Sequence, residues 1–345
     1  MTVGHALWPD LLSDDERAWL DPGLPEPKHL DRRPDVLVVG GGIVGLATAV
    51  ACTRAGVGSV VVLERAHLGA GASGGAAGRL IPEAHAGIDA PVLVDLGRLS
   101  LAAWKELDHT WPGGGLGLVG LDWVGLDGRV IPQARLNPLR ALARMAAWLP
   151  CVATGIEVNA IASGGGRLES VQTSAGEFHP GAVVFATGTP PRIDGLPLQL
   201  PSHEVKGHIL ASEPTSLALP ALAATLATSI DAGRLLIGGT LDIGDNERVV
   251  RPEVIAAMWS DLESAWPPAR GIRISHRWAC FRAAHPDLLP VIDQIPSLSN
   301  AWLTSGHYKT GVLMAPATGR ALAHWIRTGQ RPREVVGLGI DRFAA

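Results

Sequence analysis

A glycine-rich turn between an apolar strand and a helix of small residues constrains the fold of this chain more than any other feature. Asp35–Val39 (DVLVV) is typical of a buried parallel strand, and Ile43–Ala55 predicts a helix. Gly40, Gly42 and Gly45 follow the pattern G-x-G-x-x-G at their junction. The first glycine permits a tight turn, the second lets a diphosphate approach the backbone, and the third lets helix and strand pack closely. The pattern therefore predicts the start of a βαβ unit.

The next strand carries the second feature that this unit requires. Ser59–Leu63 (SVVVL) predicts a buried strand that ends at Glu64. A carboxylate at this place accepts hydrogen bonds from the adenosine ribose hydroxyls and repels a 2′-phosphate. The pyrophosphate would then lie on the amides and dipole of the helix N-terminus, around Ile43 and Val44. These features favour a dinucleotide site over a glycine-rich packing turn, but the unit alone does not distinguish FAD from NAD.

Composition limits the class of protein further. The chain has 345 residues, of which 47% are hydrophobic and 18% charged, with a formal net charge of -4. These values fit a globular enzyme with a large core and give no reason to expect a nucleic-acid partner. The apolar run from Val36 to Cys52 is long enough for a membrane span, but it divides into a strand and a helix, so no span is expected.

The cysteines and the N-terminus indicate a compartment. Cys52, Cys151 and Cys280 form neither a disulfide framework nor a zinc-ligand pattern, so no metal site is predicted. The first residues lack a basic region followed by an apolar core, which argues against a signal peptide. A cytoplasmic location is the expectation.

Periodicity and turn residues predict further elements. Ser13 and Glu16 have capping-box spacing before a short helix that reaches Leu20. Gly69–Gly78 is too rich in glycine for a regular element, and Gly87–Pro132 is a mixed segment. Other expected helices are Asn137–Trp148, Pro252–Ala265 and Gly311–Ile326. Other expected strands are a hairpin over Ile156–Thr173, then Ala182–Phe185, Val205–Ser212, Arg234–Gly238 and Ile272–Phe281.

From Asp35 to about Ile326 the sequence resembles the D-amino-acid oxidase and glycine oxidase (DAO) family of FAD-dependent flavoproteins. The resemblance is carried by eight segments in the order of the family: DVLVVGGGIVGLATA with VVVLER, GASGGAAGRLIPEAH, NPLRALARMA, the hairpin with AVVFATG, VKGHIL, GRLLIGGT, WACFRAAHPDLLPVI and SGHYKTGVLMAPATG. Eight segments in order are far more specific than any one of them.

The resemblance implies an α/β fold in which a Rossmann-type FAD-binding domain is interleaved with an antiparallel-sheet substrate domain. The FAD-binding domain would comprise residues 34–86, 134–200 and 282–345, the last with a C-terminal tail. The substrate domain would comprise residues 87–133, which are fewer than is usual in glycine oxidases, and 201–281. Residues 1–33 would form an N-terminal arm.

The resemblance also implies the residues that bind FAD. The loop after the second strand would pass the pyrophosphate and reach the flavin ring, Val158 would hold the adenine through its backbone, and the start of the last helix would cover the pyrimidine edge of the ring. The full cofactor-binding set is Gly40, Gly42, Ile43, Val44, Gly45, Glu64, Arg65, Ala72, Ser73, Gly74, Gly78, Arg79, Leu80, Val158, Ala186, Thr187, Gly188, Gly306, His307, Lys309, Thr310, Gly311 and Val312.

The chemistry that the resemblance implies is oxidation of the C–N bond of an amino acid or secondary amine, by hydride transfer to flavin N5. Arg282 would bind the substrate carboxylate, because a guanidinium fork binds a carboxylate through two parallel hydrogen bonds. Lys309 lies where glycine oxidases usually carry a second arginine, so it would complement the carboxylate or the reduced flavin, unless it is a solvated loop lysine. His307 is the third candidate catalytic residue. Oxygen as acceptor would give an imine, which hydrolyses to a keto acid, and hydrogen peroxide. A dehydrogenase that uses a quinone or protein acceptor, or an FAD-binding subunit of a hetero-oligomeric amine oxidase, is the alternative.

Three departures from the family pattern raise further hypotheses. Leu226 lies near the place of a tyrosine that usually helps to bind the carboxylate, and the chain's only tyrosine is Tyr308. Cys280 lies close to where related sarcosine oxidases link FAD covalently, but a small buried thiol is the preferred interpretation, and a non-covalent FAD is expected. The N-terminal arm either packs on its own domain or docks a partner subunit or a second copy of the chain.

Overall fold

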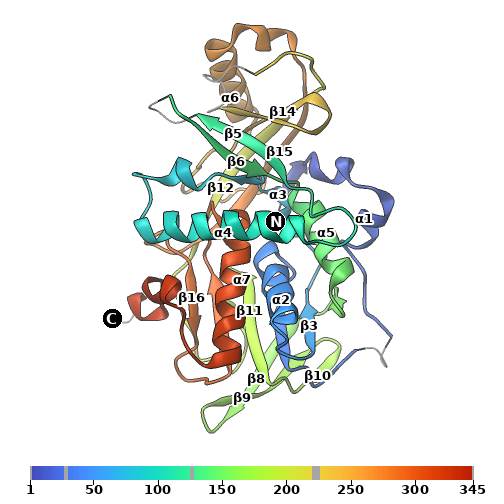
Figure 1. The fold of residues 1–345 in the computed structure, drawn as a ribbon, viewed down its shortest axis with the longest axis vertical. Helices are drawn as coiled ribbons and strands as arrows, with labels where there is room; N and C mark the ends of the chain where they lie inside the picture. Colours follow the sequence, from blue (N-terminus) through green and yellow to red (C-terminus); the bar gives the residue numbers. More distant parts are fainter. Residues whose placement is uncertain (1, 27–29, 125–127, 220–225, 344–345) are drawn as a thin grey trace.

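A six-stranded sheet forms the centre of the protein. The computed structural model describes residues 2–26, 30–124, 128–219 and 226–343 (Figure 1). Five strands of this sheet run parallel, and the edge strand β16 is antiparallel to its neighbour. Their order is β16 (Val291–Gln294), β17 (Ala301–Ser305), β11 (Ala182–Gly188), β2 (Val36–Val39), β3 (Val60–Leu63) and β7 (Val152–Ala153).

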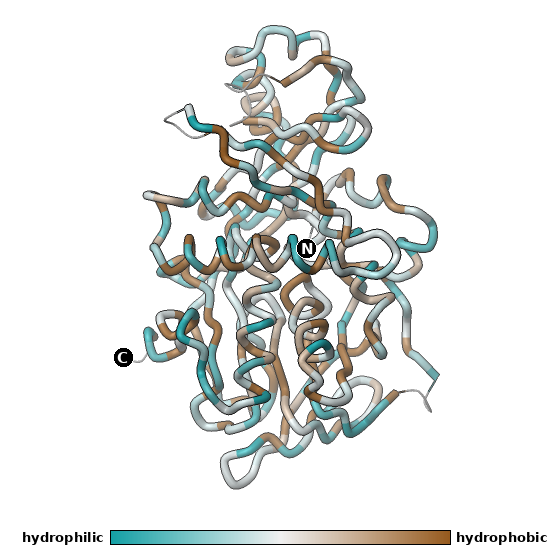
Figure 2. The backbone as a smooth tube through the Cα atoms, in the orientation of Figure 1, coloured by the Kyte–Doolittle hydropathy of each residue, from teal (hydrophilic) through white to brown (hydrophobic). Residues whose placement is uncertain are grey.

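Two long helices pack side by side on one face of this sheet. These are α2 (Ile43–Arg54) and α7 (Gly311–Thr328), and α4 (Pro91–His109) crosses α7 (Figure 1). A Cβ atom at Gly319 of α7 would lie 2.6 Å from the carbonyl oxygen of Ala47 in α2, so this glycine permits the close approach of the two helices. Figure 2 shows the hydrophobic colour concentrated on the central strands and on the inward sides of these helices.

One helix and a small sheet pack beside the central sheet. Helix α5 (Pro138–Trp148) packs against α2, and its N-cap Asn137 accepts hydrogen bonds from the amides of Leu139 and Arg140. A separate three-stranded sheet contains β8 (Val158–Gly164), β9 (Arg167–Thr173) and β10 (Gly176–Phe178). The predicted hairpin is therefore present, with its turn at Gly165 and Gly166, both at positive φ.

A second large sheet, which is antiparallel, lies beyond α4. Its strand order is β1 (Val3–His5), β15 (Ile274–Ala284), β12 (His203–Ser212), β14 (Arg234–Gly238) and β13 (Ala227–Ile230). Helix α6 (Pro252–Ala265) covers this sheet through Ile255, Met258 and Leu262. A neighbouring small sheet contains β4 (Arg79–Leu80), β6 (Val130–Arg135) and β5 (Val119–Val124).

The N-terminal arm packs on its own chain. It consists of β1, a 3₁₀ turn at Trp8–Leu11 and α1 (Asp14–Ala18), and β1 forms the edge of the second sheet by pairing with β15. The predicted capping box is present: Ser13 Oγ accepts from the Glu16 amide at 3.2 Å, and Glu16 accepts from the Ser13 amide at 3.1 Å. Further 3₁₀ turns are Pro82–His85, Asp231–Gly233, Pro267–Gly271, Arg333–Leu338 and Ile340–Phe343.

One prediction of secondary structure is wrong, and a second is incomplete because the mixed segment includes a long helix that was not predicted. Gly69–Gly78 contains the single-turn helix α3 (Ala72–Gly75), which tertiary contacts support, because Trp278 Nε1 donates to Gly75 O at 3.0 Å. The segment 87–132 contains the 19-residue helix α4, which buries Leu96 and Trp104. Among the described residues, no helix is long and apolar enough to cross a membrane.

Candidate active site

The glycine turn after β2 has the close contacts that its sequence predicts. Gly40 has φ +119°, and a Cβ atom there would lie 2.4 Å from Ala186 O at the end of β11. A Cβ atom at Gly45 would lie 2.0 Å from Gly40 O, and Gly42 is the N-cap of α2. The turn is therefore tight enough to bring the first amides of α2, at Ile43 and Val44, to the carboxyl edge of the sheet.

Glu64 is hydrogen-bonded to the glycine turn. Its Oε2 accepts from the Gly41 amide at 2.7 Å, and its Oε1 accepts from the Ala66 amide at 2.9 Å. The carboxylate is thus fixed at the end of β3, where the ribose contact is predicted. The neighbouring Arg65 is exposed. Val158 begins β8, two residues after Ile156, whose amide donates to Glu64 O at 2.9 Å.

The glycine-rich loop after β3 folds back on this turn. Ser73 Oγ accepts from the Ile43 amide at 3.0 Å, so α3 meets the N-terminus of α2. Ala72 begins α3 and is exposed, whereas Gly74 is buried within it. A Cβ atom at Gly78, which has φ +70°, would lie 2.0 Å from Leu136 O, and this close contact fixes the start of β4.

Arg79 has the most unusual environment of the loop. Its Nε and Nη2 atoms are buried and have no hydrogen-bond partner among the described residues, and burial lowers the pKa of the guanidinium to about 10. A buried cation without an acceptor is costly unless a bound group supplies the acceptor. Leu80, the next residue, is fully buried. The loop therefore presents a cation that suits an anionic or carbonyl-rich group, and the phosphates and pyrimidine ring of FAD fit this requirement.

The start of α7 lies against the same edge of the sheet. The Gly306 amide donates to Gly188 O at 2.8 Å, which joins the segment before α7 to the end of β11, where Ala186 and Thr187 lie. Thr310 is the N-cap of α7, followed by Gly311 and Val312. A helix N-terminus stabilises negative charge, so this segment suits the pyrimidine edge of a flavin.

His307 is buried before this helix. Burial lowers its pKa to about 4, so the imidazole is neutral near pH 7. Its Nε2 lies 3.2 Å from Thr318 Oγ1 of α7. These contacts indicate that His307 shapes the turn into α7.

Lys309 has an acidic partner. Its Nζ lies 3.0 Å from Asp89 Oδ1, and Asp89 Oδ2 lies 2.6 Å from His85 Nδ1. The ammonium group therefore joins the start of α7 to the segment that leads into α4. Its charge is balanced in this arrangement, which weakens the hypothesis that Lys309 binds a substrate carboxylate.

Arg282 lies on β15 above two glycines. A Cβ atom at Gly207 would lie 2.1 Å from its Nη1, and one at Gly239 would lie 2.7 Å from its Nη2. Nη1 donates to Thr240 O at 2.9 Å and to Lys206 O at 3.4 Å. A side chain at either position would displace the guanidinium from this place, so the two glycines leave the room that it occupies.

A buried polar network holds the segment that positions Arg282. The His208 amide donates to Thr240 Oγ1 at 2.8 Å, Thr240 Oγ1 donates to Asp242 Oδ2 at 2.6 Å, and His208 Nδ1 lies 2.7 Å from the same oxygen. Lys206, with no exposed surface, pairs with Asp245 at 2.9 Å. This network fixes Thr240, whose carbonyl orients Arg282.

Tyr308 belongs to this site, although the sequence did not assign it a role. It has φ +48°, and its amide donates to Ala283 O at 2.8 Å, beside Arg282. Burial raises the pKa of its hydroxyl, and the nearby charge of Arg282 acts in the opposite direction. Its position next to His307 and its being the only tyrosine were the available signals.

Cys280 lies two residues before Arg282, on the face of β15 that meets α3. A Cβ atom at Gly75 would lie 2.4 Å from the Cys280 Cβ, so the two backbones are in close contact. Burial raises the pKa of this thiol. A buried, protonated thiol is a poor nucleophile, which favours the packing role over a covalent link to FAD.

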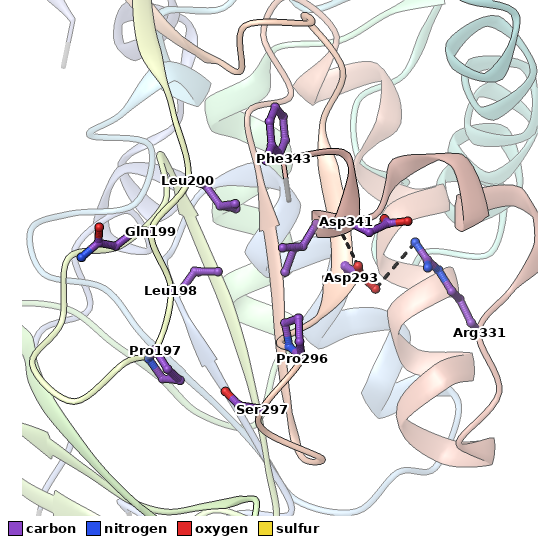
Figure 3. A pocket seen from close by; sticks show the side chains of 11 residues that line it. Pro197, Leu198, Gln199, Leu200, Asp293, Pro296, Ser297, Arg331, Asp341 and Phe343 are labelled. Atoms are coloured by element: carbon purple, nitrogen blue, oxygen red, sulfur yellow. Dashed lines mark hydrogen bonds and ion pairs between the residues drawn. The ribbon is translucent and has the colours of Figure 1, made fainter. Parts of the chain in front are cut away.

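A large cavity lies elsewhere. It has a volume of about 580 Å³ and is lined by the segment 197–200, by β16 and by the C-terminal turns, with Asp293 and Arg331 paired at 3.6 Å (Figure 3). None of the predicted site residues lines it. The predicted site residues thus lie apart from this cavity.

The chain combines a parallel sheet that carries a dinucleotide-type glycine turn with an antiparallel sheet that carries Arg282. The model of the DAO family, FAD dependent oxidoreductase, matches residues 35–126 and 118–325. The chain belongs to this family, whose members include amino-acid oxidases and dehydrogenases.

Individual relatives agree with this assignment. The chain is 26% identical to a glycine oxidase of Pseudomonas aeruginosa, over 86% of this chain and 95% of the relative. It is 27% identical to a D-amino acid dehydrogenase of Chromohalobacter salexigens, over 55% of this chain and 47% of the relative. The crystal structure of glycine oxidase from Geobacillus kaustophilus has a TM-score of 0.74 at 23% identity and covers 90% of this chain and 99% of that chain. The α/β fold with interleaved sheets is therefore confirmed.

Proposed function

We propose that this enzyme oxidises the C–N bond of an amino acid whose carboxylate is bound by Arg282. The observation that carries the proposal is the set of hydrogen bonds that this guanidinium makes. Only its Nη1 donates to protein acceptors, both of them carbonyls, and no carboxylate among the described residues forms an ion pair with it. A positioned arginine with one edge available suits a carboxylate, which it binds through two parallel hydrogen bonds.

Tyr308 is proposed as the second ligand of the carboxylate. Leu226 occupies the region where family members usually carry a tyrosine, and it cannot donate a hydrogen bond. Tyr308 reaches the neighbourhood of Arg282 from the other side, through the loop before α7. A phenol hydroxyl beside a guanidinium gives a carboxylate a third donor.

The FAD would be held by the glycine turn, the loop after β3 and the start of α7. Gly40, Gly42 and Gly45 with the first amides of α2 would bind the pyrophosphate, and Glu64 would bind the ribose. Arg79 would find its missing acceptor on the cofactor. When bound, FAD supplies the acceptor for the two electrons that leave the C–H bond next to the nitrogen. The protein's part is to fix the amino acid by its carboxylate and to exclude water from the reacting carbon.

Oxygen is the proposed final acceptor. The overall reaction is then amino acid plus O₂ plus water giving 2-oxo acid, ammonia and hydrogen peroxide. The glycine oxidase relative supports this choice, because it matches almost its whole length, whereas the dehydrogenase relative matches over less than half. The arm packs on its own chain, which favours a self-sufficient enzyme over a subunit that needs a partner to cover this surface.

The variant Tyr308→Phe tests the proposed carboxylate site. Loss of one hydrogen bond to a charged group should raise KM for the amino acid about tenfold, which corresponds to ~1.4 kcal/mol. The kcat should not change, because Arg282 still fixes the reacting carbon, and kcat is therefore the internal control. Steady-state kinetics of the purified variant measure both values. An unchanged KM for the amino acid would remove Tyr308 from the site.

A further inference from the structure

The N-terminal arm contacts the loop that is proposed to hold the flavin. Trp8 is buried, and its Nε1 donates to Ala76 O at 2.7 Å, just after α3. The side-chain amide of Asn137, the N-cap of α5, donates to Trp8 O at 3.3 Å. The arm therefore helps to hold the glycine-rich loop 69–78 in place. Any contact that holds the arm in place should also stabilise this loop.

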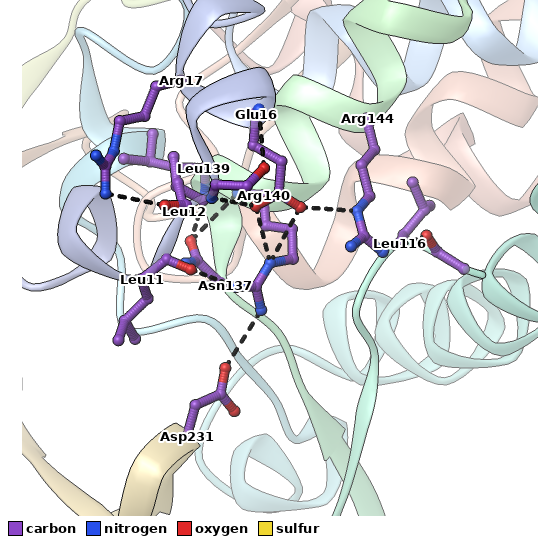
Figure 4. Close-up of polar contacts among 12 residues, drawn as sticks. Leu11, Leu12, Glu16, Arg17, Leu116, Asn137, Leu139, Arg140, Arg144 and Asp231 are labelled. Carbon is purple, nitrogen blue, oxygen red and sulfur yellow. Dashed lines mark hydrogen bonds and ion pairs between the residues drawn. The ribbon is translucent and has the colours of Figure 1, made fainter. Parts of the chain in front are cut away.

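An ionic cluster holds one part of the arm in place (Figure 4). Glu16 of α1 pairs with Arg140 at 3.3 Å and with Arg144 at 3.0 Å, and both arginines belong to α5. Arg140 also pairs with Asp231 at 3.3 Å. This cluster holds α1 against α5.

A second cluster lies at the first half of the arm. It brings together His5 of β1, Asp10 of the first 3₁₀ turn and His276 of β15. Asp10 Oδ2 lies 2.9 Å from His276 Nε2 and 3.5 Å from His5 Nε2, and the three ligand atoms lie within 4.8 Å of one another. Ligands about 2.0 Å from a tetrahedral ion lie roughly 3.3 Å apart, and the two distances from Asp10 lie on either side of this value.

The hydrogen bonds around His276 orient its ring for such a role. Its Nδ1 lies 2.8 Å from Ser275 Oγ, and that hydroxyl donates to Ser212 O at 2.8 Å while accepting from Arg234. Since the hydroxyl proton is used, Nδ1 carries the ring proton and donates to Ser275. In the neutral ring, the Nε2 lone pair then faces an Asp10 oxygen at 2.9 Å. Two such acceptors are in contact only when a proton or a cation lies between them.

We propose that His5, Asp10 and His276 bind a divalent transition-metal ion of the Zn²⁺ class, which fastens the N-terminal arm to the second sheet. Two imidazoles and one carboxylate suit this class of ion, whereas Mg²⁺ and Ca²⁺ prefer oxygen ligands. Metal-binding histidines usually donate a hydrogen bond from the ring nitrogen that does not bind the metal, and the contact from His276 Nδ1 to Ser275 Oγ is of this kind. The fourth position is open to water, because the side chains of His5 and Asp10 are 69% and 50% exposed.

The sequence alone gave no metal pattern because two ligands come from the first ten residues and the third lies 266 positions after Asp10. The pairing of β1 with β15 brings them together, with His5 opposite Arg277. The site is separate from the proposed substrate site and does not depend on the proposed activity.

Equilibrium dialysis of the holoenzyme against Zn²⁺ tests the proposal, on protein that carries no polyhistidine tag. The wild-type protein should bind one equivalent, and Co²⁺ in its place should give the visible absorption of a tetrahedral or five-coordinate ion. His5→Ala and Asp10→Asn should each weaken binding at least tenfold. Both residues are exposed, so these variants should fold. His109→Ala, which removes an exposed histidine from the end of α4, is the matched control.

The stability of the arm gives an independent readout. Added Zn²⁺ should raise the midpoint of thermal unfolding and slow proteolytic cleavage within residues 1–26 of the wild type and of His109→Ala, but not of His5→Ala. Absence of stoichiometric binding, or equal affinity in wild type and both ligand variants, would overturn the proposal. A protonated His276 that pairs with Asp10 would then account for the contact.

Discussion

Replacing Arg282 by alanine should lower kcat/KM for the amino-acid substrate about 1,000-fold, which corresponds to ~4 kcal/mol. The Arg282 guanidinium lies against Gly207 and Gly239 and donates to the carbonyl of Thr240, whose hydroxyl is hydrogen-bonded to His208 and Asp242. Its loss would remove both the attraction for the carboxylate and the orientation of the reacting carbon. The flavin content should stay unchanged, because Arg282 is not proposed to bind the cofactor. Steady-state kinetics and the visible flavin spectrum measure the two effects.

Two further variants sharpen this result. Arg282→Lys keeps the charge but loses the planar fork, so it should recover only part of the activity. Arg277→Ala removes an exposed arginine from the same strand and should behave as the wild type. An Arg282→Ala enzyme with kcat/KM within about threefold of wild type would contradict the proposed carboxylate site.

Replacing Gly45 by valine should abolish stable binding of FAD. A Cβ atom at this position would lie 2.0 Å from Gly40 O, and the valine methyl groups add to the overlap. The turn must open to relieve it, which moves the first amides of α2 away from the place proposed for the pyrophosphate. We expect the affinity for FAD to fall at least about 100-fold, which corresponds to ~2.7 kcal/mol. Flavin content after purification and titration of the apoprotein with FAD measure the change.

The matched control is Gly120→Ala, on the exposed strand β5, where an added Cβ meets nothing within 4 Å. It should retain the flavin. A far-ultraviolet circular dichroism spectrum like that of the wild type would show that Gly45→Val still folds. A folded Gly45→Val protein that binds FAD normally would place the cofactor away from this turn.

The βαβ unit could be predicted from sequence because its signals are local. The apolar strand, the glycine spacing and Glu64 all lie within about 30 residues, and each has a geometric reason that the structure shows. Helix α4 was missed although its buried residues Leu93, Leu96, Ser100 and Trp104 have helical spacing. The glycines and tryptophans that follow α4 masked this pattern. Contacts across the fold support the helix, such as Trp104 Nε1 donating to Val312 O at 2.9 Å.

The residues of the candidate site also differ in whether the sequence could predict their role. Arg282 could be named because it lies in a segment with a recognisable pattern. The partner of Lys309 could not, since Asp89 lies 220 residues away and no pattern connects the two. Tyr308 comes beside Arg282 because its segment pairs with the end of β15, where Ala284 and His307 form a bridge. Such contacts arise from the meeting of separate elements, and single-sequence reasoning has no access to them.

The most direct test of the central claim is the anaerobic reaction of the purified flavoprotein with small amino acids, followed in the visible flavin band. Glycine, sarcosine, D-alanine, D- and L-proline and bulkier N-alkyl amino acids form the panel, each beside the amine that lacks its carboxylate. The account predicts that at least one amino acid bleaches the band, that its carboxylate-free counterpart does not at the same concentration, and that air restores the colour. A firmly bound flavin that no amino acid bleaches, or that the carboxylate-free amines bleach equally well, would contradict it.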